Sequence, residues 1–105
     1  MDLRGKKLGL LLSVEPAHPN FSRCLQLAET ALTRGVEVYL YCLDEAVRGA
    51  SDARLQSLHA RGVRLFACAY ALQQRDLPPA GPAVLSGLTM LGDIIAGTDR
   101  FLSFN

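Results

Sequence analysis

The residues best suited to chemistry are three cysteines, Cys24, Cys42 and Cys68. Cys68 follows the apolar run 64–67 and precedes the helix-like segment 69–75, so its sulfur is expected at a strand end and in the first turn of a helix. A thiol in that position lies near the positive end of the helix dipole, which favours the thiolate. The same local pattern also fits a small buried residue, the commonest fate of a free cysteine.

The other two cysteines have less favourable surroundings for reaction. Cys24 lies within an apolar helical stripe, which predicts a packing role. Cys42 ends a predicted strand, and the negative charges of Asp44 and Glu45 beside it tend to raise the pKa of its thiol. We therefore take Cys68 as the catalytic candidate and Cys42 as a candidate secondary thiol. Arg75, about two helical turns after Cys68, adds positive charge near that thiol if the helix persists.

Other kinds of site lack the residues they need. The loop 14–20 contains two prolines and Glu15 but no glycine, so it offers few free amides to cradle a phosphate. There is no nucleophile elbow for a serine hydrolase, and His18 and His59 lie far from any metal-ligand spacing. An odd number of cysteines without a CxxC pair suits neither a disulfide framework nor a zinc site. We expect no cofactor and no metal.

Composition limits the class of protein. A chain of 105 residues with 50% hydrophobic and 20% charged residues predicts one folded domain over residues 1–105. The net charge is +1, the basic residues are scattered and tryptophan is absent, which argues against nucleic acid as a partner. The apolar run 8–14 resembles a signal peptide but is interpreted as a strand, and no run reaches the roughly twenty residues of a membrane span. Free cysteines predict a reducing cytoplasm.

The positions of these residues depend on strands that alternate with helices along the chain. Apolar runs and alternating patterns predict strands at 8–14, 36–41, 63–67, 83–85 and 100–104. Helices are expected to begin near the capping residues Asn20, Ser51 and Ser86, with a short helical turn after Cys42 and another after Cys68. This alternation predicts an α/β three-layer sandwich with a mainly parallel five-stranded sheet, in a flavodoxin-like arrangement.

A parallel sheet brings the carboxyl ends of its strands to one edge, where open α/β sheets bind ligands. We therefore expect all three cysteines to lie toward the same edge. On the second strand, Tyr39 and Tyr41 share a face with Glu37, an unusual lining for a sheet covered by helices. Either this face takes part in oligomerisation, or the tyrosines pack beneath helices with their hydroxyls satisfied at the edge.

The order of segments also resembles a known family. The segments that carry the resemblance are the opening apolar strand, the segment 28–38 with its arginine-glycine turn, 43–47, Cys68 with the helix-like 69–75, and the closing 92–95 and 99–104. Together they resemble the DsrE/DsrF-like family of small TusD- and YchN-like sulfur-relay proteins, although Asp76 stands where an arginine-glycine pair is common.

This resemblance implies a function for Cys68. In catalytic members of the family, the matching cysteine carries a persulfide sulfur and passes it between proteins, and members commonly form trimers or hexamers. We therefore expect a small intracellular sulfur-relay, or sulfurtransferase-like, protein with sulfur donor and acceptor proteins as partners. Two alternatives stay open: a non-catalytic oligomeric interaction subunit with a structural Cys68, and a small-ligand binding module that uses the same edge.

Overall fold

The structure is a computed structural model that describes residues 2–79 and 81–105. Its centre is a parallel sheet whose strands are β1 (Lys7–Leu12), β2 (Glu37–Cys42), β3 (Arg64–Cys68), β4 (Val84–Ser86) and β5 (Arg100–Phe104). The five strands lie in the order β4-β3-β2-β1-β5, and all neighbouring pairs are parallel. The predicted α/β fold with a five-stranded parallel sheet is confirmed.

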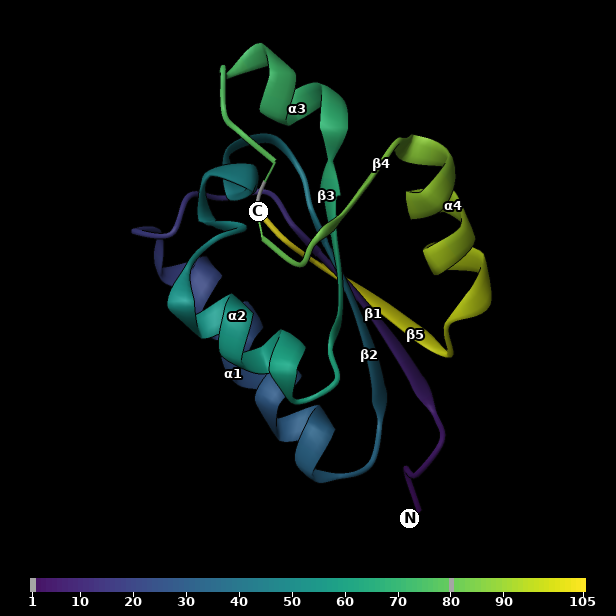
Figure 1. Ribbon diagram of the computed structural model, residues 1–105. Coiled ribbons are helices and arrows are strands. Elements are labelled where there is room, and N and C mark those ends of the chain that lie inside the picture. The colour runs from purple at the N-terminus through teal and green to yellow at the C-terminus, as the bar shows by residue number, and fades with distance from the viewer. Residues whose placement is uncertain (1, 80) are drawn as a thin grey trace.

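Helices connect the strands and cover both faces of the sheet. They are α1 (Pro19–Thr33), α2 (Ala53–Ala60), α3 (Ala69–Gln74) and α4 (Leu88–Gly97), with the 3₁₀ helix η1 (Asp44–Gly49) after β2. Helices α1 and α2 lie together on one face, whereas α4 lies on the other (Figure 1). None of the helices within residues 2–79 and 81–105 is long and apolar enough to cross a membrane.

This division of helices follows from the direction in which the chain travels across the sheet. From β1 through β2 to β3 each strand is laid beside the last, and the connecting helices α1 and α2 fall on one face. From β4 the chain returns past the whole sheet to β5, beyond β1. Because crossovers between parallel strands are right-handed, reversing the direction of travel puts α4 on the opposite face.

The two faces of the sheet are packed to different extents. On the side of α1 and α2, inward residues such as Leu10, Val38 and Leu40 are fully buried. On the other side α4 buries only Ile94, while Leu88 and Ile95 remain 63% and 50% exposed. The core is therefore concentrated between the sheet and the α1–α2 layer.

Three predicted helix caps are wrong by one or two residues. Helix α1 is capped by His18, whose Nδ1 accepts the Asn20 backbone N–H at 3.0 Å, so Asn20 lies inside the helix. Pro19 occupies the first helical position, where a missing N–H costs nothing and the fixed φ suits the helix. Helix α2 is capped by Asp52 in place of Ser51.

The cap of α4 differs from the prediction in a way that matters for the site. Gly87 caps this helix with no side-chain hydrogen bond, and Ser86, the predicted cap, is the last residue of β4. The predicted strand 83–85 is thus shifted by one residue. The Ser86 side chain is consequently not engaged at the helix terminus and lies instead beside β3.

Candidate functional site

Cys68 occupies the junction between a strand and a helix, as predicted. It is the last residue of β3 and the N-cap of α3, with φ −68° and ψ 114°. The backbone N–H of Ala71 donates to the Cys68 sulfur, with an N···S distance of 3.4 Å. An amide that points at sulfur stabilises a thiolate more than a thiol, because the anion is the stronger acceptor. Cys68 is only 4% exposed, so the thiol is covered in this conformation.

The register of the strands shows which side chains lie beside Cys68. Cys68 pairs with Ser86 on β4, and two residues earlier Phe66 pairs with Tyr41 on β2. Since side chains alternate along a strand, Tyr41, Phe66, Cys68 and Ser86 lie on one face of the sheet. This is the α4 face: Tyr39 shares it and pairs with Gly9, where an added Cβ would meet Ile94 of α4 at 3.0 Å.

The Tyr41 hydroxyl holds the end of β4, the edge strand beside β3. Its ring is fully buried, and its hydroxyl donates to the carbonyl oxygens of Ser86 and Gly87, at 3.2 and 3.0 Å. Burial raises the pKa of the Tyr41 hydroxyl, and the neighbouring sulfur of Cys68 adds to the rise. Of the two interpretations of the tyrosine face, burial with the hydroxyl satisfied at the sheet edge is therefore correct for Tyr41. Tyr39 is half-buried and stacks with Arg64, 5.3 Å from ring centre to guanidinium carbon.

Ser86 brings a hydroxyl to the same place. It is the register partner of Cys68, and its Oγ is buried. Within residues 2–79 and 81–105, that Oγ has no hydrogen-bond partner. A buried hydroxyl is normally hydrogen-bonded, so this unpaired one is a feature that needs an explanation.

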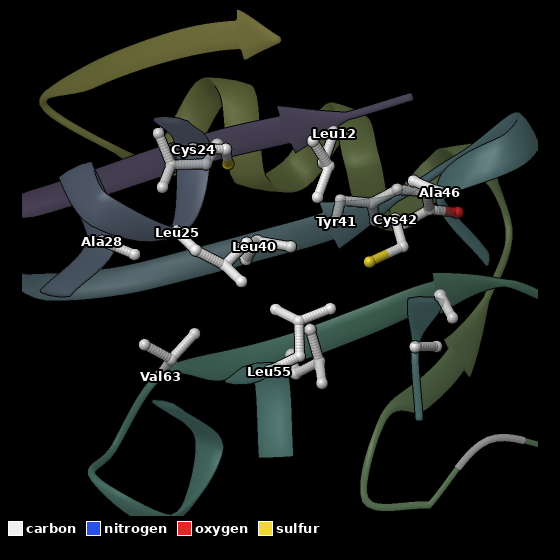
Figure 2. Packing of buried hydrophobic residues seen from close by; sticks show 14 of the residues in the cluster. Leu12, Cys24, Leu25, Ala28, Leu40, Tyr41, Cys42, Ala46, Leu55 and Val63 are labelled. Atoms are coloured by element: carbon white, nitrogen blue, oxygen red, sulfur yellow. The ribbon is translucent and has the colours of Figure 1, made fainter. Parts of the chain in front are cut away.

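Cys24 and Cys42 lie elsewhere. Cys42 is the last residue of β2, but it follows Tyr41 and so points to the opposite face, toward Cys24 on α1. Figure 2 shows both cysteines among the apolar side chains of the core, near Leu40. Cys42 and Cys68 both end neighbouring parallel strands at the carboxyl edge, as expected, but strand alternation sends their side chains to opposite faces of the sheet.

Burial makes these two thiols unreactive. Cys24 and Cys42 are both 0% exposed. Desolvation raises the pKa of Cys24 to about 12. It also raises the pKa of Cys42, to which the nearby Cys24 contributes. Burial in the apolar core is the main cause of the raised pKa of Cys42, which differs from the expected effect of Asp44 and Glu45. Cys42 as a secondary thiol thus has neither access nor a stabilised anion.

Arg75 does not supply free positive charge to Cys68. Its Nε donates to Glu45 Oε1 at 2.9 Å, and its guanidinium also donates to the Ala71 carbonyl at 3.1 Å. Arg48 pairs with the same carboxylate at 2.6 Å, and these two arginines lower the pKa of Glu45. Arg75 is therefore engaged with Glu45 and the Ala71 carbonyl, and part of its charge is offset where η1 meets α3 by a carboxylate that it shares with Arg48. It ties these two elements together at the sheet edge.

An apolar groove in the described part of the chain is remote from Cys68. A groove of about 460 Å³ lies between α1 and the first residues of β1 and β5, with Leu8, Leu27 and Val36 among its lining residues. These residues are at the amino ends of the strands, whereas Cys68 is at the carboxyl ends. The groove therefore gives no support to ligand binding at the edge that carries Cys68.

Two residues of this site were not found from the sequence. Tyr41 was considered for its strand face, and Ser86 was assigned to a helix cap. The signal in the sequence was the alternation of side chains along the strand, which places Tyr41 on one face. If the tyrosine is buried there, its hydroxyl needs a hydrogen-bond acceptor. Which acceptor it finds depends on strand order, and the sequence does not give strand order.

The fold and the site define a three-layer α/β protein with a buried cysteine that caps a helix at the carboxyl edge of a parallel sheet. The chain belongs to the DsrE/DsrF-like family, whose model matches residues 6–104. Its structure is similar to the crystal structure of the YchN protein from E. coli, with a TM-score of 0.79 at 16% sequence identity, covering 94% of this chain and 98% of that one. A comparison with curated protein sequences finds no match.

Proposed function

We propose that this protein is a sulfur carrier that holds a persulfide on Cys68 and passes the outer sulfur to a partner thiol. The observation that carries the proposal is the position of Cys68 in a DsrE/DsrF-like chain: a strand-end cysteine whose sulfur accepts the Ala71 amide. The buried Cys24 and Cys42 leave it as the thiol best placed to react.

The transfer is a thiol exchange at sulfur. The Cys68 thiolate attacks the outer sulfur of a donor persulfide, a new S–S bond forms, and the donor thiolate leaves with the electron pair of the broken S–S bond. An acceptor thiolate then attacks the outer sulfur on Cys68, and Cys68 leaves as thiolate. Neither step needs an oxidant, a reductant, a metal or a cofactor.

Transfer requires that Cys68 be uncovered, and the fold offers a route. The strand that pairs with it, β4, has three residues and lies at the edge of the sheet, so it is hydrogen-bonded to one neighbour only. Short edge strands are among the elements that open at low free-energy cost. Local separation of β4 from β3 would expose the sulfur without unfolding the core on the other face.

Apolar surface beside β4 suits protein partners. Val84 and Leu85 on β4, and Leu88 at the start of α4, are 53%, 42% and 63% exposed. We propose that this surface receives a sulfur donor or acceptor protein or a second copy of the chain, in a trimer or hexamer. Free thiols at all three cysteines suit a reducing cytoplasm as the compartment.

Intact-mass measurement after incubation with a persulfide donor tests the carrier function. We expect wild type to gain one sulfur, Cys68→Ser to gain none, and Cys24→Ser and Cys42→Ser to behave as wild type. Cys24→Ser and Cys42→Ser are the matched controls, because each removes another thiol of the same chain. If wild type gains no sulfur, the carrier proposal fails.

One observation favours a second candidate, a non-catalytic interaction subunit. Cys68 is 4% exposed, which is the burial of a structural cysteine. In that case Cys68→Ala leaves assembly and partner binding unchanged, and no sulfur is carried. Size-exclusion chromatography of wild type and Cys68→Ala, together with the mass measurement, separates the two candidates.

A further inference from the structure

The Ser86 hydroxyl lies beside the candidate reactive sulfur and has no assigned role. Ser86 and Cys68 are register partners on adjacent parallel strands, so their side chains leave the same face of the sheet at the same level. Ser86 Oγ is buried and, among the described residues, has no hydrogen-bond partner. Gly87 caps α4 without side-chain help, so the hydroxyl is not engaged at that helix either.

An unpaired buried hydroxyl costs stability, because it gives up its hydrogen bond to water and gains none. Such a group calls for an explanation, and a catalytic role is one of them. The neighbouring group that changes state in the proposed cycle is Cys68. A thiol is a weak acceptor, whereas a thiolate is a strong one, and a hydroxyl donates well to an anion.

We propose that the Ser86 hydroxyl donates a hydrogen bond to the sulfur anion of Cys68. In this conformation the Ser86 hydroxyl makes no hydrogen bond to the sulfur, so the proposed bond requires another rotamer of the Ser86 side chain. This assignment rests on the proposed function for its purpose, since the anion is the nucleophile that takes the sulfur and the leaving group that releases it. The hydroxyl keeps its proton throughout.

The Ser86 donor and the Ala71 amide approach the sulfur from different elements. The amide belongs to α3, and the hydroxyl comes from β4 across the strand pair. Tyr41 holds the backbone of Ser86 through its carbonyl at 3.2 Å, which keeps the hydroxyl at the level of Cys68. The anion is thus solvated by protein donors in a place where water has little access, since Cys68 is 4% exposed.

The rate of Cys68 alkylation by iodoacetamide at pH 7 tests this assignment. We expect Ser86→Ala to lower the rate about tenfold, as for the loss of one hydrogen bond to a charged group. Ser86→Thr retains the hydroxyl and should stay within about twofold of wild type. The control is Ser103→Ala on β5, which shares the face of Tyr41 through Leu11 but lies at the opposite edge of the sheet.

A purely structural role for Ser86 gives the opposite result. Removing its oxygen makes room beside the sulfur and loosens the cover, so alkylation of Ser86→Ala would be unchanged or faster. Either outcome overturns the proposal, as would a Ser86→Thr variant that is as slow as Ser86→Ala. Near-UV circular dichroism establishes that the variants share the wild-type fold.

The outcomes for Ser86 and for the carrier function remain distinguishable. Alkylation needs no persulfide, so it reports the hydrogen bond alone. Slower alkylation in Ser86→Ala supports the hydrogen bond even if wild type takes up no sulfur, a result that sinks the carrier function only. Conversely, sulfur uptake by wild type with equal alkylation of both proteins overturns the role of Ser86 and leaves the carrier function standing.

Discussion

Replacing Tyr41 by phenylalanine should loosen the cover of Cys68 while leaving the core packed. The hydroxyl is one donor shared by two carbonyl acceptors, those of Ser86 and Gly87 at 3.2 and 3.0 Å. The ring is fully buried and stays in place in the variant. The variant therefore removes the hydrogen bond between β2 and the junction of β4 with α4, together with the hydroxyl that neighbours the Cys68 sulfur.

The expected loss of stability depends on how the carbonyl groups of Ser86 and Gly87 are solvated once the Tyr41 hydroxyl is removed. Leaving a buried acceptor unpaired costs about 1–3 kcal/mol. Gly87 is exposed and Ser86 half-buried, so water reaches the first carbonyl and partly the second. The variant also escapes the cost of burying a hydroxyl. We therefore expect Tyr41→Phe to lower the free energy of unfolding by about 1 kcal/mol, the lower end of that range.

Local opening should respond in the same proportion. A change of about 1 kcal/mol is about a fivefold change in an opening equilibrium at room temperature. Hydrogen exchange at the β4 amides and alkylation of Cys68 should both become about fivefold faster in Tyr41→Phe. Ser86→Ala is expected to slow alkylation, and because the Tyr41 hydroxyl also neighbours the Cys68 sulfur, exchange at the β4 amides is the measurement that reports access alone.

Tyr39→Phe is the matched control. Tyr39 lies two residues earlier on the same strand and face, but its ring stacks with Arg64 and lies away from the carboxyl end of β2. It should leave β4 exchange and Cys68 alkylation unchanged. If Tyr41→Phe also leaves both unchanged, or if β4 exchange rises equally in the two variants, the hydroxyl of Tyr41 does not restrain β4.

Three further predictions concern the rest of the fold. The free energy of unfolding should fall above pH about 8.5. In that range the unfolded chain releases the Cys24 proton, whereas the folded chain holds it up to a pKa of about 12. Urea titrations of Cys24→Ala should therefore show a slope that is smaller by about 1.4 kcal/mol per pH unit. Arg75→Gln should change Cys68 alkylation less than twofold in moderate salt, because Glu45 offsets part of the Arg75 charge and salt screens the rest. Gly9→Ala should cost about 1–3 kcal/mol by thermal unfolding, since its Cβ would lie 2.7 Å from Phe101, whereas Gly92→Ala, with open space, should be neutral or stabilising.

The sequence was sufficient for the strands and for the neighbourhood of Cys68, because both depend on local pattern. The run 8–14 is apolar at nearly every position, and apolar residues alternate with others in 36–41. These patterns locate the ends of β1 and β2 to within two residues. The strand-to-helix junction at Cys68 is likewise local. Such features need no knowledge of which strands are neighbours.

Helix caps were less predictable because several residues compete for each one. Before α1, Asn20 is a good cap by type, yet Pro19 places the first turn earlier and His18 takes the position. Before α2, Ser51 and Asp52 are both strong caps, and which one leads is decided by how the chain leaves η1. A shift of the helix start by one residue decides which side chain caps the helix and which is free for another role, as Ser86 is before α4.

Asp76 adopts a backbone conformation that is uncommon for residues other than glycine. It ends α3 with φ at +52°, in the left-handed region that glycine occupies most easily. Aspartate tolerates this region better than most residues do, because its short side chain hydrogen-bonds locally. An aspartate can therefore hold this turn, which ends α3 and lets the chain return to β4.

The site itself depends on strand order, which local pattern does not contain. Cys42 and Cys68 end neighbouring strands, yet the register Tyr41–Phe66 places them on opposite faces, so a one-residue shift would have exchanged their surroundings. Ser86 faces Cys68 only because β4 pairs in parallel with β3 at this level. A hydroxyl that looked like a helix cap in the sequence thereby becomes a neighbour of the thiol. The strand that covers the sulfur also supplies the proposed donor to its anion, so full separation of β4 would remove that donor, and the productive opening must be small enough to keep Ser86 beside Cys68.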